Sequence, residues 1–393
     1  MMLKAFKYKL NPNEEQIVLI NKHIGACRYI YNLALETKQM AYAGNKVNLS
    51  YFELHSQLKE LKEELPWLKE LNSQSLQQAI TNLDKAYTAF FKGQNDFPKY
   101  KKKSNGGSFN VPQNVRIIDG KLIIPKFTKK NGIDIILHRE IKGEIRQATI
   151  SRTPTGKYFV SILCETGEQN ISKNNIKEET TIGIDLGIKD FAITSNGEVF
   201  ENPKYLRKAH DKLKYIQKKY SKNKGKKTKQ KLAKLHEKVT NKRKDFLHKV
   251  STKLIRENQT ICLENLNVSG MIKNHNLAQS ISDVSWSTFV NMLEYKGEWY
   301  GTNILKIGRF EPSSKTCSNC GNINKELTLK DREWTCVKCN TEHDRDVNAA
   351  INIKNFSLRN ILSGTDRKNH DELPTLVGVM THEAHPISYA VGG

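Results

Sequence analysis

Hydrophobic residues recur every three or four positions through most of the first hundred residues, which is the spacing of one face of an α-helix. The first stripe follows Asn11 and Pro12, which suit the cap and the first residue of a helix. A second stripe opens at Ser50, with Glu53 three residues later as in a capping box. A third stripe follows it. The sequence therefore predicts a helical bundle over residues 11–105.

The hydrophobic period then shortens to two, the alternation of a half-buried β-strand. Strands of this kind are expected at 3–10, 115–118, 122–124, 147–151 and 158–164. Asp119-Gly120 and the Thr-Pro-Thr-Gly run at 153–156 have the composition of tight turns, so each should join two strands in a hairpin. We predict that residues 1–10 and 106–170 form one small β-barrel that recruits the N-terminal strand.

Beyond a polar linker at 166–180, strands and helices alternate, which favours an α/β core. Strands are expected at 181–186, 191–194, 260–264 and 303–307, and helices at 204–257, 284–298 and 346–355. This core would occupy residues 178–310, with the long helices of 204–257 inserted into it. Gly, Asp, His and Pro are scattered without a period after residue 358, so we expect the tail 358–393 to be mostly disordered.

The charge balance narrows the class of partner. Lys and Arg number 64 against 41 Asp and Glu, which gives a formal net charge of +23 and an isoelectric point near 9.5. Such an excess attracts polyanions, of which nucleic acid is the commonest candidate, with an anionic membrane surface as the competing partner. No apolar run approaches the ~18–20 residues of a spanning helix, and residues 1–10 lack a signal-peptide core. We therefore expect a soluble cytoplasmic protein without a membrane partner.

Four cysteines near the C-terminus have the spacing of a zinc ribbon, Cys-x2-Cys-x15-Cys-x2-Cys. Cys317 and Cys320 form the first pair, and Cys336 and Cys339 form the second. Thiolates at this spacing converge on one tetrahedral Zn²⁺, and because the protein fills all four positions the metal would be structural. Two disulfides or a redox-active pair are the alternative interpretations, and both are disfavoured in an intracellular chain. The ribbon is expected over residues 311–342.

Three carboxylates lie at the ends of predicted buried elements. Asp185 ends an apolar strand in which Gly183 lies on the same face, and we interpret this glycine as space for a metal or a phosphate. Glu264 ends a second strand, and Asp346 begins the helix after the ribbon. Carboxylate oxygens suit Mg²⁺ and Mn²⁺, and two such ions about 4 Å apart support phosphodiester hydrolysis. Each acid alone has a simpler interpretation as a helix cap or a solvated strand end, the role we assign to Asp344, so the hypothesis depends on all three together.

Four segments match a known family in their residues and in their order. They are Gly183-Ile184-Asp185-Leu186-Gly187, Glu264-Asn265-Leu266, Pro312-Ser313-Ser314-Lys315-Thr316-Cys317 and His343-Asp344-Arg345-Asp346-Val347-Asn348-Ala349-Ala350. These segments resemble TnpB, a family of transposon-encoded RNA-guided DNA nucleases regarded as ancestors of the type V CRISPR effectors. The match extends from Met1 to about Asn355, and it is most specific in the C-terminal motifs.

The resemblance implies a RuvC-type, RNase H-like nuclease fold interrupted by the zinc ribbon, with catalytic, Mg²⁺-binding carboxylates at Asp185, Glu264 and Asp346. It also implies a wedge domain formed by the β-barrel of 1–10 and 106–170, a helical recognition domain at 11–105 and a final RuvC helix at 343–357. The partners that it implies are a guide RNA from the transposon end and double-stranded DNA beside a short motif read by the protein. One protein per guide RNA is the expected stoichiometry.

Two surfaces are candidates for contact with nucleic acid. Lysine-rich runs at 99–103 and 214–245 suit a channel that holds an RNA–DNA hybrid by its backbone. Amide and hydroxyl side chains on the polar side of the third helix suit adenine edges, and in this family that helix region helps to read the target-adjacent motif. The candidate residues are Tyr51, Ser73, Gln74, Gln77, Gln78, Lys99, Lys101, Lys102 and Lys103, with Tyr100 as a stacking ring. An ordinary solvated helix surface is the alternative for each of them.

We therefore predict a Mg²⁺-dependent, RNA-guided DNA endonuclease. The alternatives are an RNA-guided DNA-binding repressor that does not cleave and a DNA transposase that joins DNA ends itself. The complete set of three carboxylates argues against the repressor, and no Tyr or Ser lies in a recognisable recombinase setting to favour the transposase.

Overall fold

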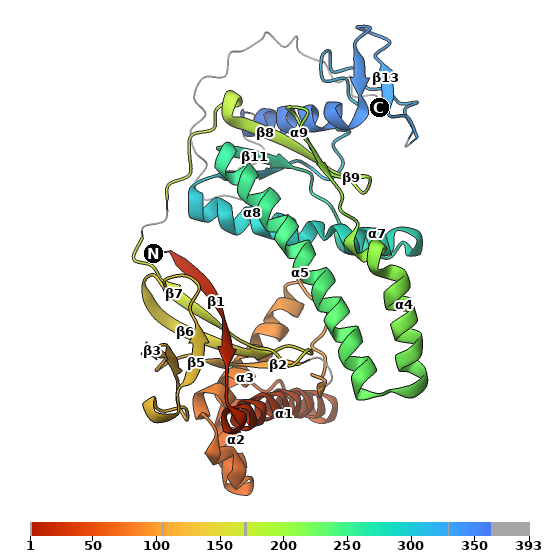
Figure 1. Ribbon diagram of the computed structural model, residues 1–393. Coiled ribbons are helices and arrows are strands. Elements are labelled where there is room, and N and C mark those ends of the chain that lie inside the picture. The colour runs from red at the N-terminus through yellow and green to blue at the C-terminus, as the bar shows by residue number, and fades with distance from the viewer. Residues whose placement is uncertain (1, 104–105, 169–170, 329, 363–393) are drawn as a thin grey trace. The chain divides into compact units, whose positions relative to one another are not determined.

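The computed structural model describes residues 2–103, 106–168, 171–328 and 330–362 (Figure 1). The chain divides between residues 169 and 170 into two compact units, each with its own sheet and helices. Most of the predicted tail, residues 363–393, lies outside the described residues.

Three helices and a short 3₁₀ turn occupy the predicted bundle. They are α1 (Glu14–Asn45), α2 (Tyr51–Glu64), the 3₁₀ turn Pro66–Glu70 and α3 (Ser73–Phe91). The predicted start of the first helix, with Asn11 as its cap, is wrong. Asn13 caps α1 by accepting the backbone N–H of Gln16, because the chain up to Asn11 is still paired in a strand. The predicted capping box of α2 is confirmed at Ser50 and Glu53.

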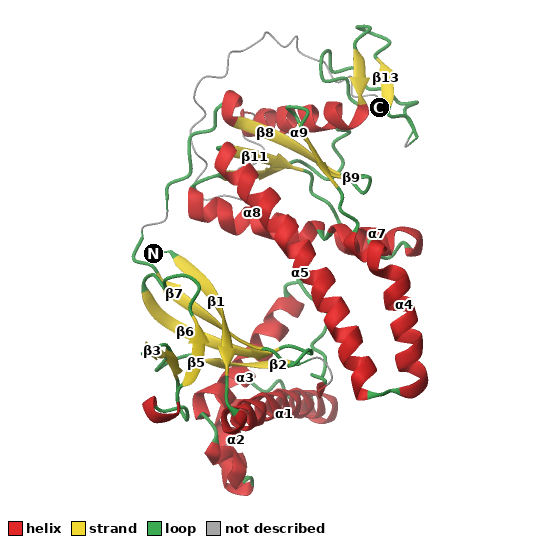
Figure 2. Ribbon diagram, viewed as in Figure 1, coloured by secondary structure: helices red, strands yellow, loops and turns green. Residues whose placement is uncertain are grey.

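A seven-stranded antiparallel sheet forms the rest of the first unit (Figure 2). Its strands, in spatial order, are β2 (Gly107–Val111), β6 (Glu144–Arg152), β7 (Tyr158–Glu165), β1 (Leu3–Asn11), β5 (Ile133–Ile136), β4 (Lys121–Ile123) and β3 (Arg116–Ile118). Both predicted hairpins and the recruitment of the N-terminal strand are confirmed, whereas β2 and β5 are additional strands. Closure into a barrel stays a prediction, since β2 and β3 lie at opposite edges of the hydrogen-bonded order.

The sheet and the helices of this unit share one hydrophobic core. On β1, the side chains of Phe6, Tyr8 and Leu10 are buried in that core, while Lys7 and Lys9 between them are exposed. Burying a large apolar side chain stabilises a fold by ~1.5–3 kcal/mol. The alternation therefore determines which face of the strand meets the core that the sheet shares with α1.

The second unit contains a five-stranded sheet that positions the candidate site. Its strands, in spatial order, are β10 (Val199–Glu201), β9 (Asp190–Thr194), β8 (Thr181–Leu186), β11 (Thr260–Leu263) and β12 (Asn303–Lys306). β8 pairs antiparallel with β9 and parallel with β11, and β12 continues parallel to β11. The four strands predicted in this region are confirmed, and β10 adds an edge.

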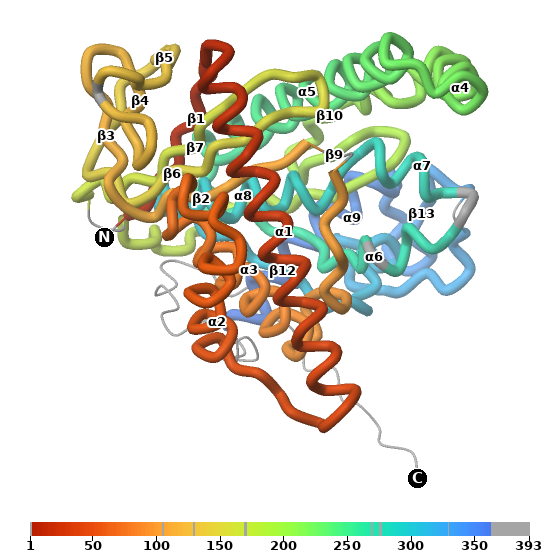
Figure 3. The backbone as a smooth tube through the Cα atoms, turned by 90° about the horizontal axis from the view of Figure 1, so that it is seen from below, coloured from red at the N-terminus to blue at the C-terminus, as the bar shows by residue number. Residues whose placement is uncertain are grey.

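The helices of the second unit are α4 (Tyr205–Asn223), α5 (Lys226–Glu257), α6 (Val268–Met271), α7 (His275–Val284), α8 (Trp286–Tyr300) and α9 (Arg345–Leu362), and some of them cover both faces of the sheet (Figure 1). α5 and α8 pack on the face of β8 that carries Ile182 and Ile184, and α9 packs on the opposite face at Gly183. The lysine-rich insert is the hairpin of α4 and α5, which lie against each other (Figure 3).

Helix α9 is longer than the sequence predicts. It continues to Leu362 instead of ending near residues 355–357, because Phe356 and Leu358 are buried with Ile353 in a core on this side of the sheet. Residues 358–362 are therefore helical, and their assignment to a disordered tail is wrong.

The segment between β12 and α9 contains a small antiparallel ribbon of β13 (Glu333–Thr335) and β14 (Glu342–Asp344). Within the described ranges, no helix has both the length and the apolar composition needed to cross a membrane.

Candidate active site and metal centre

Two of the predicted carboxylates meet because their strands are parallel neighbours. β8 and β11 pair with Ile184 opposite Leu263, so the next residues, Asp185 and Glu264, lie at the same end of the two strands. Paired strands are ~4.8 Å apart, which brings the bases of the two side chains close together. The hydroxyl of Ser313 donates a hydrogen bond to Oε1 of Glu264 at 2.7 Å and so restricts that carboxylate.

Asp346 reaches the same place on helix α9. This helix lies so close to β8 that a Cβ atom at Gly183 would be 2.0 Å from the backbone oxygen of Ala350 and 2.8 Å from the backbone nitrogen of Lys354. Asp346 precedes Ala350 by one helical turn and shares its side of α9, just as Gly183 shares its strand face with Asp185. The interpretation of Gly183 as space for a metal or a phosphate is wrong, because the α9 backbone fills that space.

All three carboxylates line one pocket of about 400 Å³. Its remaining walls come from the β8–β9 turn, α8, the ribbon and α9, through Leu186, Gly187, Ile188, Lys189, Asp190, Ile193, Trp286, Ser314, Arg332 and Arg345. Among the described residues, only the four cysteines form a group of three or more potential metal ligands within 4.8 Å of one another. The ligand oxygens of the three carboxylates therefore do not all lie within 4.8 Å of one another.

Hydrogen bonds fix the start of α9 and thereby the position of Asp346. Asp344 caps the helix, because its Oδ1 accepts the backbone N–H groups of Asp346 at 3.0 Å and of Val347 at 2.8 Å. Nη1 of Arg332, in the ribbon, donates to Oδ2 of Asp346 at 2.8 Å. The predicted capping role of Asp344 is confirmed, and an arginine from outside the helix orients the Asp346 carboxylate.

The electrostatics of this pocket favour a cation. Burial, reinforced by the negative charges of Glu264 and Asp346, raises the pKa of Asp185 from its usual 3.8 to about 8, although Arg345 and Arg332 oppose the rise. A dication between the carboxylates would favour the ionised form of each. Three carboxylates are also the hard oxygen donors that Mg²⁺ and Mn²⁺ prefer, so these residues fit the predicted ions.

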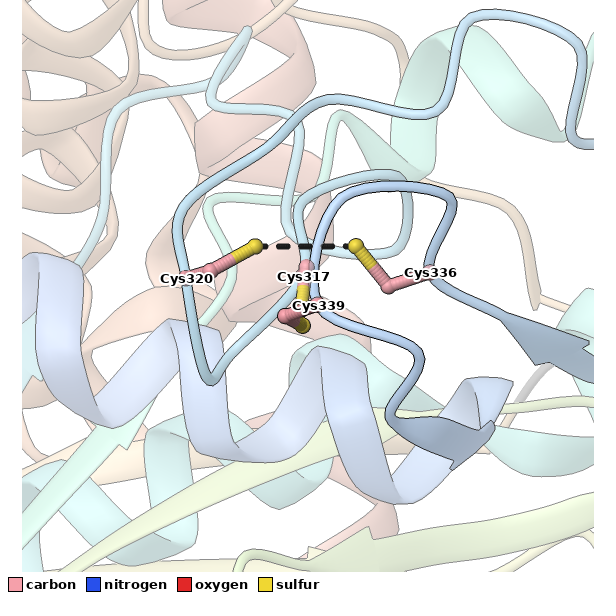
Figure 4. A group of neighbouring side chains, drawn as sticks. All are labelled: Cys317, Cys320, Cys336 and Cys339. Atoms are coloured by element: carbon pink, nitrogen blue, oxygen red, sulfur yellow. Dashed lines mark hydrogen bonds between the residues drawn. The ribbon is translucent and has the colours of Figure 1, made fainter.

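The four cysteines converge as their spacing predicts (Figure 4). The Sγ–Sγ distance is 3.5 Å between Cys320 and Cys336 and 3.6 Å between Cys317 and Cys339, and all four sulfurs lie within 4.8 Å of one another. Four thiolates at ~2.3 Å from a tetrahedral Zn²⁺ would be ~3.8 Å apart, so the cluster fits a structural zinc ion. The four thiols are free, which contradicts the disulfide alternative.

The ribbon is tied to α9 beside the carboxylates. The buried side chain of Asn348 accepts the backbone N–H of Ser318 at 2.9 Å and donates to the backbone oxygen of Thr316 at 2.8 Å. One turn later, Asn352 donates to the backbone oxygen of Ser313 at 2.7 Å. One face of α9 therefore holds both the first zinc knuckle and the serine that restrains the second carboxylate.

Three residues that contact the site are absent from the sequence-based candidates. Ser313 and Arg332 bind carboxylates, and Nε2 of His343 lies 3.1 Å from Sγ of Cys317. Ser313 and His343 fall inside the quoted family motifs, so those motifs carried a signal for them. Arg332 lies in a polar loop of the ribbon, where nothing in the local pattern marks it.

The predicted base-reading residues lie on the first turns of α2 and α3. Ser73 is exposed, whereas Tyr51, Gln74, Gln77 and Gln78 are half-buried. The Gln74 amide already donates to a neighbouring glutamine side chain at 2.9 Å. Contact of these residues with nucleic acid stays a prediction.

The predicted lysines of the first unit differ in their exposure and in the groups that their ammonium groups contact. Lys102 and Lys103 are exposed, and the exposed Lys99 pairs with an aspartate three residues before it at 3.1 Å. The ammonium of Lys101 instead lies 3.8 Å from the centroid of the Tyr31 ring, and desolvation lowers its pKa. Phosphate contact stays a prediction for all four lysines.

Three family models match successive parts of the chain. The OrfB_IS605 helix-turn-helix domain matches residues 1–46, the OrfB_IS605 model described as "Probable transposase" matches 161–275, and the TNB domain of Cas12f1-like proteins matches 286–353. Residues 1–46 fold here as β1 followed by the single 32-residue helix α1, which is one long helix in place of a helix-turn-helix.

Curated relatives match over nearly the whole length. A Streptomyces pristinaespiralis protein named as a candidate RNA-guided DNA endonuclease is 39% identical over 361 residues, which cover 89% of this chain and 88% of that protein. InsQ of Escherichia coli strain K12, named in the same way, is 31% identical over 376 residues, which cover 89% of this chain and 91% of that protein. The chain belongs to the TnpB family.

A solved structure has a similar fold to this TnpB-family chain. It is the cryo-EM structure of a Cas12f1–sgRNA–target DNA complex, with a TM-score of 0.54 and 15% sequence identity. The match covers 87% of this chain and 83% of that chain. The TnpB-family fold seen here is thus shared with a Cas12 effector.

Proposed function

We propose that this chain is an RNA-guided DNA endonuclease of a transposon, which cleaves double-stranded DNA matched by its guide RNA. The observation that carries the proposal is that Asp185, Glu264 and Asp346, from β8, β11 and α9, line a single pocket. Relatives 39% and 31% identical are named for this activity. The formal net charge of +23 supplies the long-range attraction that both nucleic-acid partners need.

The second unit would be a nuclease core of the RuvC type, with an RNase H-like fold. Its sheet has an antiparallel hairpin of β8 and β9 followed by two strands parallel to β8. Acids stand at the ends of β8 and β11 and at the start of the last helix. This placement supports the fold that the resemblance implies, with the α4–α5 hairpin as an insert and the ribbon before the final helix.

Asp185, Glu264 and Asp346 would hold the divalent ions. When bound, two such ions lower the pKa of an attacking water and stabilise the leaving oxygen of a phosphodiester. The chain prepares this geometry in advance, because Ser313 restrains Glu264 and Arg332 restrains Asp346. Zinc held by the four cysteines would brace the ribbon that supplies both restraining residues.

The first unit would read the guide and the target. We assign its sheet, residues 1–10 and 106–170, to a wedge barrel and its helices, residues 11–105, to a recognition domain. The half-buried amides at the start of α3 would contact the target-adjacent motif, and the lysines at 99–103 would contact phosphates. One protein molecule would act with one guide RNA.

The test begins with sequencing the RNA that co-purifies with the protein. A DNA duplex matched to that RNA, flanked by a randomised adjacent motif, should be cut in Mg²⁺ and left intact in EDTA. Asp185→Ala should bind the same DNA without cutting it, because binding comes from the basic residues and not from this carboxylate. A wild-type complex that binds matched DNA but never cuts it in Mg²⁺ would identify a repressor instead.

A further inference from the structure

A second pocket lies within the first unit, where α1, α3, β2 and the segment 99–102 meet. Its volume is about 530 Å³, within the ~300–1,000 Å³ typical of pockets for small organic ligands. Its wall on α3 comes from Ser75, Ala79 and Asn82, and Asn82 lies one helical turn beyond the predicted Gln78. The segment 99–102 was predicted to contact nucleic acid, but neither the motifs nor the family resemblance pointed to Arg28, Asn82 or Asn110 in the same pocket.

The floor of the pocket is apolar and closely packed. Ile24, Cys27, Ala79 and Phe109 are all buried there. β2 lies directly on α1, since a Cβ atom at Gly107 would be 2.3 Å from Cγ2 of Ile24. An apolar floor of this kind suits the face of an aromatic ring.

Three polar side chains also line the pocket, and they do not form hydrogen bonds with one another. Arg28, Asn82 and Asn110 line the pocket and are half-buried. Across the described ranges, the side chains of these three residues make no hydrogen bond or ion pair. A carboxamide offers both a donor and an acceptor, the combination that pairs with adenine edges, while a guanidinium suits a phosphate. These polar groups are accessible in the pocket and are not engaged by other described residues, so a bound partner can use them.

The wall formed by the segment 99–102 is held firmly. Backbone N–H of Lys101 donates to Oδ1 of Asn32 at 2.8 Å, and Nδ2 of Asn32 donates back to the Lys101 oxygen at 3.1 Å. The Tyr100 hydroxyl donates to Gln39 at 3.0 Å, and the Lys101 ammonium sits over Tyr31. The wall is therefore preformed, with its exposed lysines at the rim.

We infer that this pocket binds one unstacked nucleotide of the bound nucleic acid. The base would lie on the apolar floor with its edge against Asn82 and Asn110, and the phosphate would lie by Arg28 and the rim lysines. Adenine is the base that the two amides match best. Proteins read single-stranded or flipped bases by this combination of an apolar face and an amide-lined edge. The inference rests on the proposed function only for the identity of the nucleic acid.

The test uses 2-aminopurine, an adenine analogue whose fluorescence rises several-fold when it leaves the base stack. It replaces each adenine in turn, first in the co-purifying RNA and separately in the target DNA. Opening of the DNA duplex will brighten several positions, but at one position, in one of the two strands, the rise on binding the full-length protein should depend on Asn82 and Asn110. That position identifies whether RNA or DNA enters the pocket.

The double variant Asn82→Ala, Asn110→Ala should abolish that rise and weaken binding about ten-fold, the loss expected when one base contact is removed. Asn45→Ala is the matched control, since Asn45 is an exposed amide at the end of α1. The double variant removes no hydrogen bond within the described residues, so its melting temperature should equal that of the wild type. Arg28→Ala should weaken binding while leaving part of the fluorescence rise.

No fluorescence rise at any position, or rises that the double variant preserves at every position, would overturn the inference. The readout does not depend on cleavage. If bound DNA is never cut in Mg²⁺ but one position still shows a rise that depends on the pocket, the pocket survives and the nuclease proposal fails. If DNA is cut but no position shows a rise that depends on the pocket, the nuclease proposal survives and the pocket inference fails.

Discussion

Replacing Gly183 by alanine tests how closely α9 must lie against β8. The new Cβ atom would be 2.0 Å from the backbone oxygen of Ala350 and 2.8 Å from the backbone nitrogen of Lys354. Real Cβ contacts essentially never fall below 3.0 Å, so the oxygen must retreat by at least 1.0 Å, the difference between 3.0 and 2.0 Å. Both atoms belong to the helix backbone, so no side-chain rotation can relieve the clash and α9 itself has to move.

This movement reaches the pocket because Asp346 is one turn from Ala350. A ~1 Å misplacement of a catalytic group lowers turnover by on the order of 100-fold, and overpacking a close contact costs ~1–3 kcal/mol of stability. Gly183→Ala should therefore cleave matched DNA about 100-fold more slowly in a single-turnover assay. Its affinity for guide RNA and target should stay near that of the wild type, because basic surfaces away from this contact supply the binding.

Gly225→Ala is the matched control for that experiment. Gly225 lies in the same unit as Gly183. It is the N-cap residue of α5, its φ is -68°, and a Cβ atom there would have no neighbour within 4 Å. This variant should cut at the wild-type rate. If Gly183→Ala is folded by thermal melting and also cuts at the wild-type rate, the close contact of α9 with β8 does not position Asp346, and the reasoning fails.

Three further predictions concern charge, zinc and the link between the ribbon and α9. The pKa of Asp185 is about 8 in the folded protein against 3.8 as its usual value, so the folded state binds more protons and stability falls as pH rises through this window. In metal-free protein Asp185→Asn should remove that contribution, so the variant should become more stable relative to the wild type as pH rises from 4 to 8, by a few kcal/mol at most; a melting-temperature difference that shrinks or stays constant over this window would have the wrong sign. Cys336→Ser should lose the zinc measured by mass spectrometry and destabilise the ribbon by ~10 kcal/mol or more, and full zinc content with unchanged melting would refute the four-cysteine site. Asn348→Ala should cost ~1–3 kcal/mol, because the Ser318 N–H loses its partner, and an unchanged melting curve would show that this bond does not hold the ribbon.

Local pattern was enough to place most elements of both units. The three–four spacing located α1, α2 and α3, and the tight-turn residues located both hairpins of the first sheet. The strands β2 and β5 were not predicted, because each is short and pairs with a strand that is distant in sequence. The end of α9 was misplaced for a similar reason: Phe356 and Leu358 are buried against distant parts of the chain, which no local pattern reveals.

The candidate site was predictable as a set of residues but not as a geometry. Asp185 and Glu264 could be recognised because each ends a predicted strand. Their proximity depends on the parallel pairing of β8 with β11, which the sequence does not reveal. Gly183 was recognised as special for the wrong reason, since helix packing, not ligand access, requires it. Arg332 came from a loop with no pattern. The nucleotide-sized pocket of the first unit combines Arg28, Asn82 and Asn110 from three elements, so only the fold could assemble it.

Counting the divalent ions bound at the carboxylates tests the central chemistry most directly. Mn²⁺ binding can be followed by electron paramagnetic resonance in the complex of protein, guide RNA and a target DNA whose scissile phosphate is a slowly cleaved phosphorothioate. Two Mn²⁺ ions are expected at this site in the wild type, with at least one lost in each of Asp185→Ala, Glu264→Ala and Asp346→Ala. Equal numbers of bound Mn²⁺ in all four proteins would contradict a site built from these three acids.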